Sequence, residues 1–184
     1  MGIDRVDNIL MVLGISLQMT ESERHIVTKE MIKGFNDCAL EAETIVTGGQ
    51  SVMNPWPIIG GTAITMCRDG EYRAVNQGQP GDKLLLTKPL GTQVAVNLKE
   101  WKGQGGKLWE QSQRYLSEQE VDEGFFMAVE SMSHLNKNAA KLMRKYEAHG
   151  ATDITGFGIK GHAQNLCSVQ KENVDFLINS LPVI

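Results

Sequence analysis

The sequence has 184 residues, of which 41% are hydrophobic and 22% are charged, and its formal net charge is −4. A chain of this composition can bury a hydrophobic core, which excludes a disordered tail. It shows no block of like charges, so neither nucleic acid nor an anionic membrane is expected as a partner. The apolar stretches are shorter than the ~18 residues that a membrane-spanning helix needs.

The first predicted element is an amphipathic helix that begins after Thr20. The residues Thr20-Glu21-Ser22-Glu23 have the pattern of a capping box, in which the hydroxyl and the Glu side chain each cap backbone N–H groups. Apolar residues then recur every three to four positions, at Val27, Met31, Phe35, Cys38 and Ala42. A short β-branched run over residues 44–47 follows, and we expect it to stop at Gly48-Gly49.

A second strand is predicted over Pro57–Cys67, with Gly60-Gly61 inside it. Glycines in a strand indicate a bulge, or another backbone that passes close by. The apolar residues of this strand occur at both parities, so we expect both of its faces to be covered. Residues 68–81 are polar and rich in turn residues, and they are the best candidate for a linker between two domains.

The second half alternates between predicted strands and helices, which indicates an α/β or α+β fold. After a second capping box at Ser117-Glu118-Gln119-Glu120, either one bent helix or two joined helices fit the apolar spacing as far as about Tyr146. The other predicted elements are a strand over Lys83–Thr87, a helix over Thr92–Trp101, a loop over Lys102–Lys107, a helix from about 158 to Val169 and a strand over Val174–Ile178.

The three cysteines, Cys38, Cys67 and Cys167, show no pairing pattern and no metal-ligand spacing. Each has apolar neighbours, so we expect buried free thiols. Free thiols are typical of a reducing compartment, and the predicted location is therefore the cytoplasm.

One candidate for chemistry is the segment Thr47-Gly48-Gly49-Gln50-Ser51. Glycines let backbone amides approach a polyanion closely, and Ser51 can donate a hydroxyl hydrogen bond, so the segment suits a phosphate group. A Gly-Gly pair is also a common turn signal, and an ordinary hairpin turn fits the same residues. The sequence leaves both interpretations open.

The other candidate is Asp153-Ile154-Thr155-Gly156-Phe157-Gly158, which precedes a predicted helix. Its acid follows a short β-like run, and Mg²⁺ takes oxygen ligands, commonly one or two carboxylates together with substrate phosphates and water. The free N–H groups at the start of the helix favour a phosphate nearby. The alternative is structural, because Asp153 or Thr155 can simply cap that helix.

Three blocks in the right order closely resemble the eukaryotic selenophosphate synthetases, also called selenide, water dikinases, and the likeness runs over essentially the whole chain. These blocks are Thr47–Ser51 with Asn54-Pro55-Trp56, then Leu86–Val96, and then Ala151–Gly158 with Gly161–Asn165. The resemblance implies synthesis of monoselenophosphate from selenide, ATP and water, with release of AMP and orthophosphate, for the synthesis of selenocysteine. It also implies a homodimer of two α/β domains similar to aminoimidazole ribonucleotide synthetase.

The resemblance assigns residue roles and a domain division. The family's ATP phosphate contacts fall on Gly48, Gly49, Gln50 and Ser51, and one of its Mg²⁺-binding aspartates falls on Asp153. Residues 1–78 correspond to part of the N-terminal ATP-binding and dimerisation domain, and 79–184 to part of the C-terminal domain, so both domains are incomplete. Members are about twice as long, and this chain resembles their middle part.

The family's catalytic cysteine or selenocysteine, and a nearby lysine, would lie before Met1, so no catalytic residue is assigned within the chain. The alternative to an enzyme is a catalytically inactive or truncated member that acts in dimerisation or regulation. Another ATP-using relative of the same fold, such as the purine synthetase, is the third hypothesis.

Overall fold

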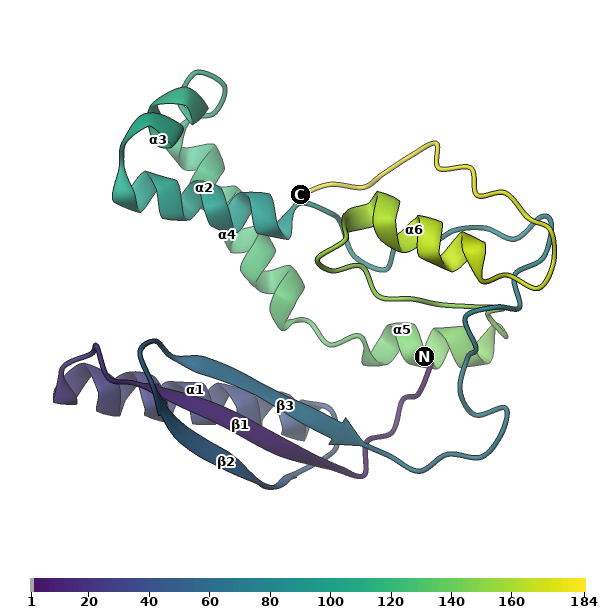
Figure 1. Ribbon diagram of the computed structural model, residues 1–184, viewed down its shortest axis with the longest axis horizontal. Helices are drawn as coiled ribbons and strands as arrows, with labels where there is room; N and C mark the ends of the chain where they lie inside the picture. Colours follow the sequence, from purple (N-terminus) through teal and green to yellow (C-terminus); the bar gives the residue numbers. More distant parts are fainter. Residues whose placement is uncertain (1) are drawn as a thin grey trace. The chain divides into compact units, whose positions relative to one another are not determined.

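The computed structural model describes residues 2–184, which form two compact units (Figure 1). The first unit contains the residues up to Val75 together with Lys137–Ala151, and the second contains Asn76–Asn136 and Thr152–Ile184. The division into domains at residues 78/79 stays a prediction. The mixture of a small sheet and several helices confirms the predicted α/β class.

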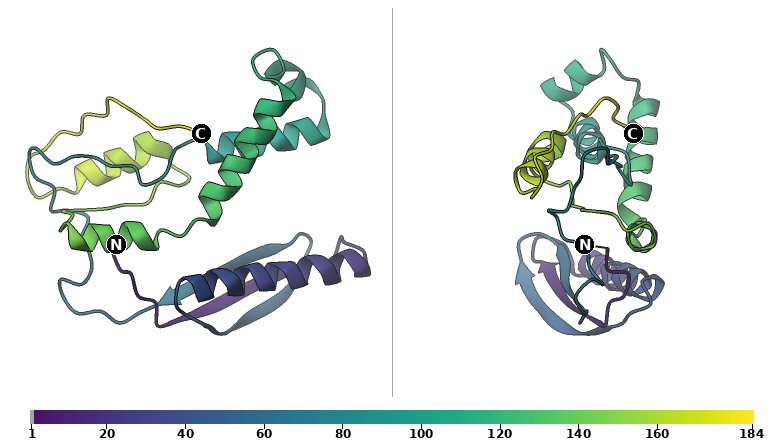
Figure 2. Two further views of the ribbon diagram at one scale, coloured as in Figure 1. Left: turned by 180° about the vertical axis from the view of Figure 1, so that it is seen from behind. Right: turned by 90° about the vertical axis from the view of Figure 1, so that its right-hand side faces the viewer.

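The first unit is built on a three-stranded sheet with the order β2-β1-β3. The central strand β1 (Asn8–Ser16) runs parallel to β2 (Val46–Asn54) and antiparallel to β3 (Ile58–Ile64). Helix α1 (Glu21–Glu41) lies against one face of this sheet (Figures 1 and 2). The short helix α5 (Lys137–Lys145) belongs to the same unit.

The predicted capping box at the start of α1 is confirmed. The hydroxyl of Thr20 accepts the N–H of Glu23, and the N–H of Thr20 donates to the Glu23 carboxylate at 2.9 Å. The Thr20 hydroxyl also donates to the Glu23 carboxylate at 2.7 Å, and this bond and the one from the Thr20 N–H hold the pKa of the Glu23 carboxyl below its ordinary value. The local sequence therefore sets where the helix begins.

Alternation along β1 divides its side chains between the two faces of the sheet. Leu13 is only 2% exposed, whereas Leu10 and Val12 are 40% and 47% exposed. In β3, Ile58 and Ile64 are paired with Gly14 and Asn8 and therefore share the face of Leu10. Both are also exposed, so the expectation that β3 is covered on both faces is not met within this unit.

The second unit contains a helical pair and a smaller helix. Helix α2 (Thr92–Gln104) packs on α4 (Glu118–Ser133), with α3 (Lys107–Ser112) between them in sequence. The buried apolar residues of these three helices are Ala95, Trp109, Val121 and Ala128. Helix α6 (Gly158–Ser168) follows the second candidate segment. The second predicted capping box is confirmed, since Ser117 and Glu120 bond reciprocally at the start of α4.

Several boundaries differ from the predictions. Of the two alternatives for residues 118–146, two helices are formed, because α4 ends at Ser133 and α5 begins at Lys137. The loop expected over Lys102–Lys107 is shorter, since α2 continues to Gln104 and only Gly105-Gly106 separate it from α3. These two glycines have φ values of 71° and 87°, which end the helix at little steric cost.

The strands predicted over Lys83–Thr87 and Val174–Ile178 are wrong. Neither segment is paired in residues 2–184, where the only bridge outside the sheet joins Leu90 to Val183. Leu85 is 86% exposed and Leu177 is 82% exposed. A strand needs a neighbour for its hydrogen bonds, and the described residues supply none at these positions.

The expectation of buried thiols is also wrong for two cysteines. Cys38 and Cys67 are exposed, and Cys167 is intermediate. Cys38 belongs to the apolar spacing of α1, but it lies outside the narrow stripe that faces the sheet, where Ala39 is buried. All three are free thiols.

Within residues 2–184, every helix is too short or too polar to cross a bilayer.

Candidate functional site

The segment Gly48–Ser51 lies inside β2 and does not end it. The strand continues through both glycines to Asn54, so the predicted break and the alternative of a hairpin turn are both wrong. All four residues are exposed. Because β1 lies on only one side of β2, the other edge of β2 has no strand beside it in the described part of the chain.

Gly49 is required by the sheet itself. Its φ is +148°, and a Cβ atom at this position would lie 1.8 Å from the carbonyl oxygen of Met11 on the neighbouring strand. Gly61 of β3 is similar, because a Cβ there would lie 2.8 Å from the oxygen of Leu10 and from Phe35 of α1. The expected close approach of another backbone is thus confirmed for Gly61. At Gly49 too, the backbone of β1 leaves no room for a Cβ atom.

The pairing of β1 with β2 shifts next to these glycines. Ile9 pairs with Val46 and Leu10 pairs with Gly48, which leaves Thr47 as an extra residue. The Thr47 hydroxyl accepts a hydrogen bond from Asn8 Nδ2 at 3.0 Å. Alternation then places the side chains of Gln50 and Ser51 on opposite faces, so a single ligand can reach both only around the free edge of β2.

Asp153 lies in an irregular, exposed turn of the second unit, and the β-like run predicted before it is not a strand. Its Oδ2 accepts the hydroxyl of Thr155 at 3.1 Å, and its Oδ1 has a longer contact of 3.5 Å with the hydroxyl of Thr152. The alternative of a helix cap is wrong. Phe157 is the N-cap residue of α6, and no side chain makes a cap hydrogen bond there.

His162 of α6 contacts the turn that carries Asp153. It is 7% exposed, and its Nε2 accepts the backbone N–H of Thr155 at 3.0 Å. The ring therefore connects α6 to the turn that carries Asp153. The sequence holds no clear signal for this contact, because any histidine near the start of a helix matches the same pattern.

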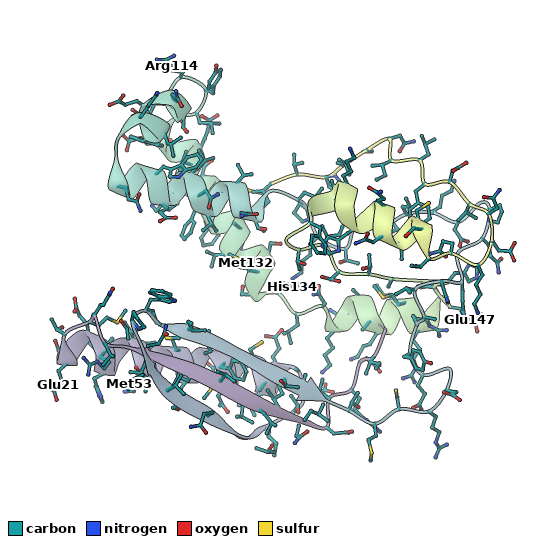
Figure 3. All side chains as sticks on the ribbon, in the orientation of Figure 1. Glu21, Met53, Arg114, Met132, His134 and Glu147 are labelled. Atoms are coloured by element: carbon teal, nitrogen blue, oxygen red, sulfur yellow. The ribbon has the colours of Figure 1, made fainter. Side chains whose placement is uncertain are left out.

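The side chain of Lys88 is bound to backbone carbonyl groups at the end of α4. Its Nζ donates to the carbonyl oxygens of Ser131 at 2.6 Å and His134 at 2.5 Å. His134, labelled in Figure 3, follows the last residue of α4. Lys88 therefore caps the C-terminal end of that helix.

The residues present fit one Mg²⁺ ligand rather than a complete metal site. Among residues 2–184 no group of three or more His, Cys, Asp or Glu side chains could hold a metal ion. The exposed carboxylate of Asp153 can supply one oxygen, and Mg²⁺ commonly takes one or two carboxylates with substrate phosphates and water for the rest. The glycine segment and Asp153 belong to different units.

Residues 79–184 match the family model described as AIR synthase related protein, C-terminal domain. Since this match covers more than half of the chain, the protein belongs to the AIR synthase related family, and the expected fold family is confirmed.

Within that family, the chain is similar to the selenide, water dikinases. It is 50% identical over 184 residues to selenide, water dikinase 3 of Danio rerio and 49% identical over 184 residues to selenide, water dikinase 2 of Homo sapiens. It is 49% identical over 183 residues to the selenide, water dikinase of Trypanosoma brucei brucei. These matches cover 100%, 100% and 99% of this chain but 41%, 41% and 47% of those proteins. The expected resemblance is confirmed, and the chain spans less than half the length of these relatives.

Proposed function

We propose that the protein to which this chain belongs is a selenophosphate synthetase. It makes monoselenophosphate from selenide, ATP and water, releases AMP and phosphate, and supplies selenium for the synthesis of selenocysteine. The observation that carries this proposal is the identity of about 50%, along the whole chain, to proteins named selenide, water dikinase. The relatives' names give no support to a non-enzymatic, regulatory chain.

The proposed ATP contact is the segment Gly48, Gly49, Gln50 and Ser51. Its support is the exposed position of these residues on β2, whose outer edge has no neighbouring strand in residues 2–184. Small residues at such an edge leave backbone groups accessible to phosphate oxygens. Because Gln50 and Ser51 face opposite sides, we expect the backbone and one of these two side chains to make the contact.

The proposed magnesium ligand is Asp153. Its carboxylate is exposed and held by the hydroxyl of Thr155. A bound Mg²⁺ would neutralise charge on the phosphates of ATP and orient them. The remaining oxygen ligands would come from ATP, water and other residues of the full-length protein.

The protein is proposed to be a cytoplasmic homodimer. The support for dimerisation is the exposed apolar face of the sheet, formed by Leu10, Val12, Ile58 and Ile64, and the support for the location is the set of three free cysteines. A sedimentation experiment on the full-length protein should show a dimer at micromolar concentration. A monomer whose sedimentation does not change with concentration would contradict the homodimer.

The experiment that tests the function is an assay of AMP release by the full-length protein with ATP, Mg²⁺ and selenide. We expect AMP release that depends on selenide, with monoselenophosphate detected by phosphorus NMR. AMP release that is unchanged without selenide would instead favour another ATP-using member of the family. No ATP cleavage by a well-folded full-length protein would favour the regulatory alternative.

A further inference from the structure

The hydrogen bond between Thr155 and His162 uses Nε2 of the histidine ring as the acceptor. A backbone N–H can only donate, so the Nε2 atom that it meets at 3.0 Å must offer a lone pair. The side chain is 7% exposed and packs against Phe157, with ring centroids 5.3 Å apart. A buried ring with a defined acceptor atom is a rigid support for a turn.

A second hydrogen bond extends this support to Asp153. The hydroxyl of Thr155 donates to Asp153 Oδ2 at 3.1 Å, so two consecutive hydrogen bonds join the buried imidazole to the exposed carboxylate. A backbone hydrogen bond from the Gly158 N–H to the Thr155 carbonyl oxygen, at 3.0 Å, also closes the turn. The space around Gly156 and Gly158 is open, because a Cβ atom added at either position would meet nothing within 4 Å. The two side-chain hydrogen bonds are therefore the ones that tie Asp153 to the buried ring.

We infer that His162 is a positioning residue, which acts through Thr155 to hold the carboxylate of Asp153 in one rotamer. The value of this arrangement rests on the proposed function, because a carboxylate that is already oriented loses less conformational entropy when it binds a cation. His162 itself touches neither the metal nor the phosphate in this proposal.

The inference can be tested by NMR on the full-length protein without any metal. In the wild type, a scalar coupling across the hydrogen bond should join the Thr155 amide nitrogen to His162 Nε2. The χ1 couplings of Asp153 should report a single rotamer. Absence of the coupling between the two nitrogens would overturn the inference before any variant is made.

Matched variants separate the hydrogen bond from simple packing. His162→Gln can place an acceptor oxygen near the position of Nε2, whereas the shorter His162→Asn cannot, although both are polar amides. We expect exchange of the Thr155 amide to become about fivefold to tenfold faster in His162→Asn, the factor that an ordinary hydrogen bond supplies. In the same variant the Asp153 rotamer should become averaged. In His162→Gln, the exchange rate of the Thr155 amide should return to within about twofold of the wild type, and Asp153 should again occupy a single rotamer.

Phe157→Leu is the control for packing, because it removes the ring contact but leaves the acceptor atom. It should leave the Asp153 rotamer unchanged. If His162→Asn and His162→Gln behave alike, or if Thr155 exchange accelerates while Asp153 keeps its rotamer, His162 does not position the carboxylate.

A separate arm tests the proposed function with Mn²⁺ as a probe for Mg²⁺. Paramagnetic broadening around Asp153 in the wild type, lost in Asp153→Asn, is the expected result. If Mn²⁺ does not broaden these signals, the result counts against the metal ligand, while the rotamer and exchange data still decide the role of His162.

Discussion

Lys88 closes the C-terminal end of α4 by donating from its ammonium to the carbonyl oxygen of Ser131 at 2.6 Å, across 43 residues of sequence. The last turn of α4 contains no basic residue of its own. The C-terminal end of a helix has carbonyl groups without partners and carries a partial negative charge. The ammonium group of Lys88 hydrogen-bonds to such carbonyls and also offsets this charge.

Replacing Lys88 should destabilise the second unit. In Lys88→Met, the carbonyls of Ser131 and His134 lose a charged donor in a partly buried position, and we expect the free energy of unfolding to fall by about 1–3 kcal/mol. Urea unfolding followed by circular dichroism measures this change. Lys83→Met, at an exposed position of the same segment, is the control and should change the stability by less than about 0.5 kcal/mol.

Gly49 and Gly60 form a matched pair for testing the sheet. Gly49→Ala would force a Cβ atom to 1.8 Å from the Met11 oxygen at a φ of +148°, whereas a Cβ at Gly60 meets nothing within 4 Å. We expect Gly49→Ala to lower the free energy of unfolding by about 3 kcal/mol or more. Gly60→Ala should be close to neutral. Thermal unfolding of both variants gives the comparison, and equal stability would show that Gly49 is not constrained by Met11.

This pair also limits how binding data on Gly49 can be interpreted. Loss of ATP binding in a Gly49 variant would follow from a disturbed β2 even if Gly49 never touched a phosphate. Ser51→Ala is the better probe of the proposed contact, because Ser51 is exposed and its substitution leaves the strand pairing intact.

Features that depend on neighbours in sequence could be predicted from the sequence. The capping boxes at Thr20 and Ser117 each join residues three positions apart, and both are formed as expected. The helix stripes that include Val27 and Val121 likewise follow from a local period. These signals need no knowledge of the rest of the fold.

Features that depend on distant partners could not be predicted. The segment Lys83–Thr87 has the composition of a strand but no neighbour in the described residues, whereas Gly48-Gly49 resembles a turn but is held in a strand by β1. The acceptor role of His162 likewise depends on where the chain places Thr155. In each case a tertiary contact overrides the local propensity.

Acid should weaken the packing of α2 on α4 through Asp122. The ammonium of Lys99, hydrogen-bonded at 2.8 Å, and that of Lys102, at 3.0 Å, hold the pKa of Asp122 below its ordinary value of 3.8. A lowered carboxyl pKa gives stability that is present above the ordinary value and is lost as the pH falls through the lowered one. We therefore expect this contribution to begin to fall below about pH 4 and to be lost once the pH is below the lowered pKa of Asp122.

The variant Asp122→Asn isolates this contribution. It should be less stable than the wild type at neutral pH, and its stability should fall less steeply between about pH 4 and pH 2. Urea unfolding at a series of pH values gives the slope of the free energy of unfolding against pH for the wild type and for Asp122→Asn. Identical slopes would mean that the two lysines do not stabilise the ionised form of Asp122.

The proposed role of Asp153 predicts a variant that folds normally but loses activity. Asn keeps an acceptor oxygen for the Thr155 hydroxyl, and Asp153 does not cap α6, so Asp153→Asn should change the free energy of unfolding by less than about 0.5 kcal/mol. In the full-length protein, however, it removes a whole charge beside Mg²⁺. Magnesium-dependent, selenide-dependent AMP release should fall by about a hundredfold or more.

The matched control is Asp175→Asn, another exposed aspartate of the second unit, which should keep both stability and turnover. A titration with Mg²⁺ adds a second criterion, because loss of a ligand should raise the magnesium concentration needed for half-maximal turnover in Asp153→Asn but not in the control. A folded Asp153→Asn protein with wild-type turnover and an unchanged magnesium dependence would show that Asp153 is not a ligand. The Thr155 and His162 hydrogen bonds would then serve only to order the turn before α6.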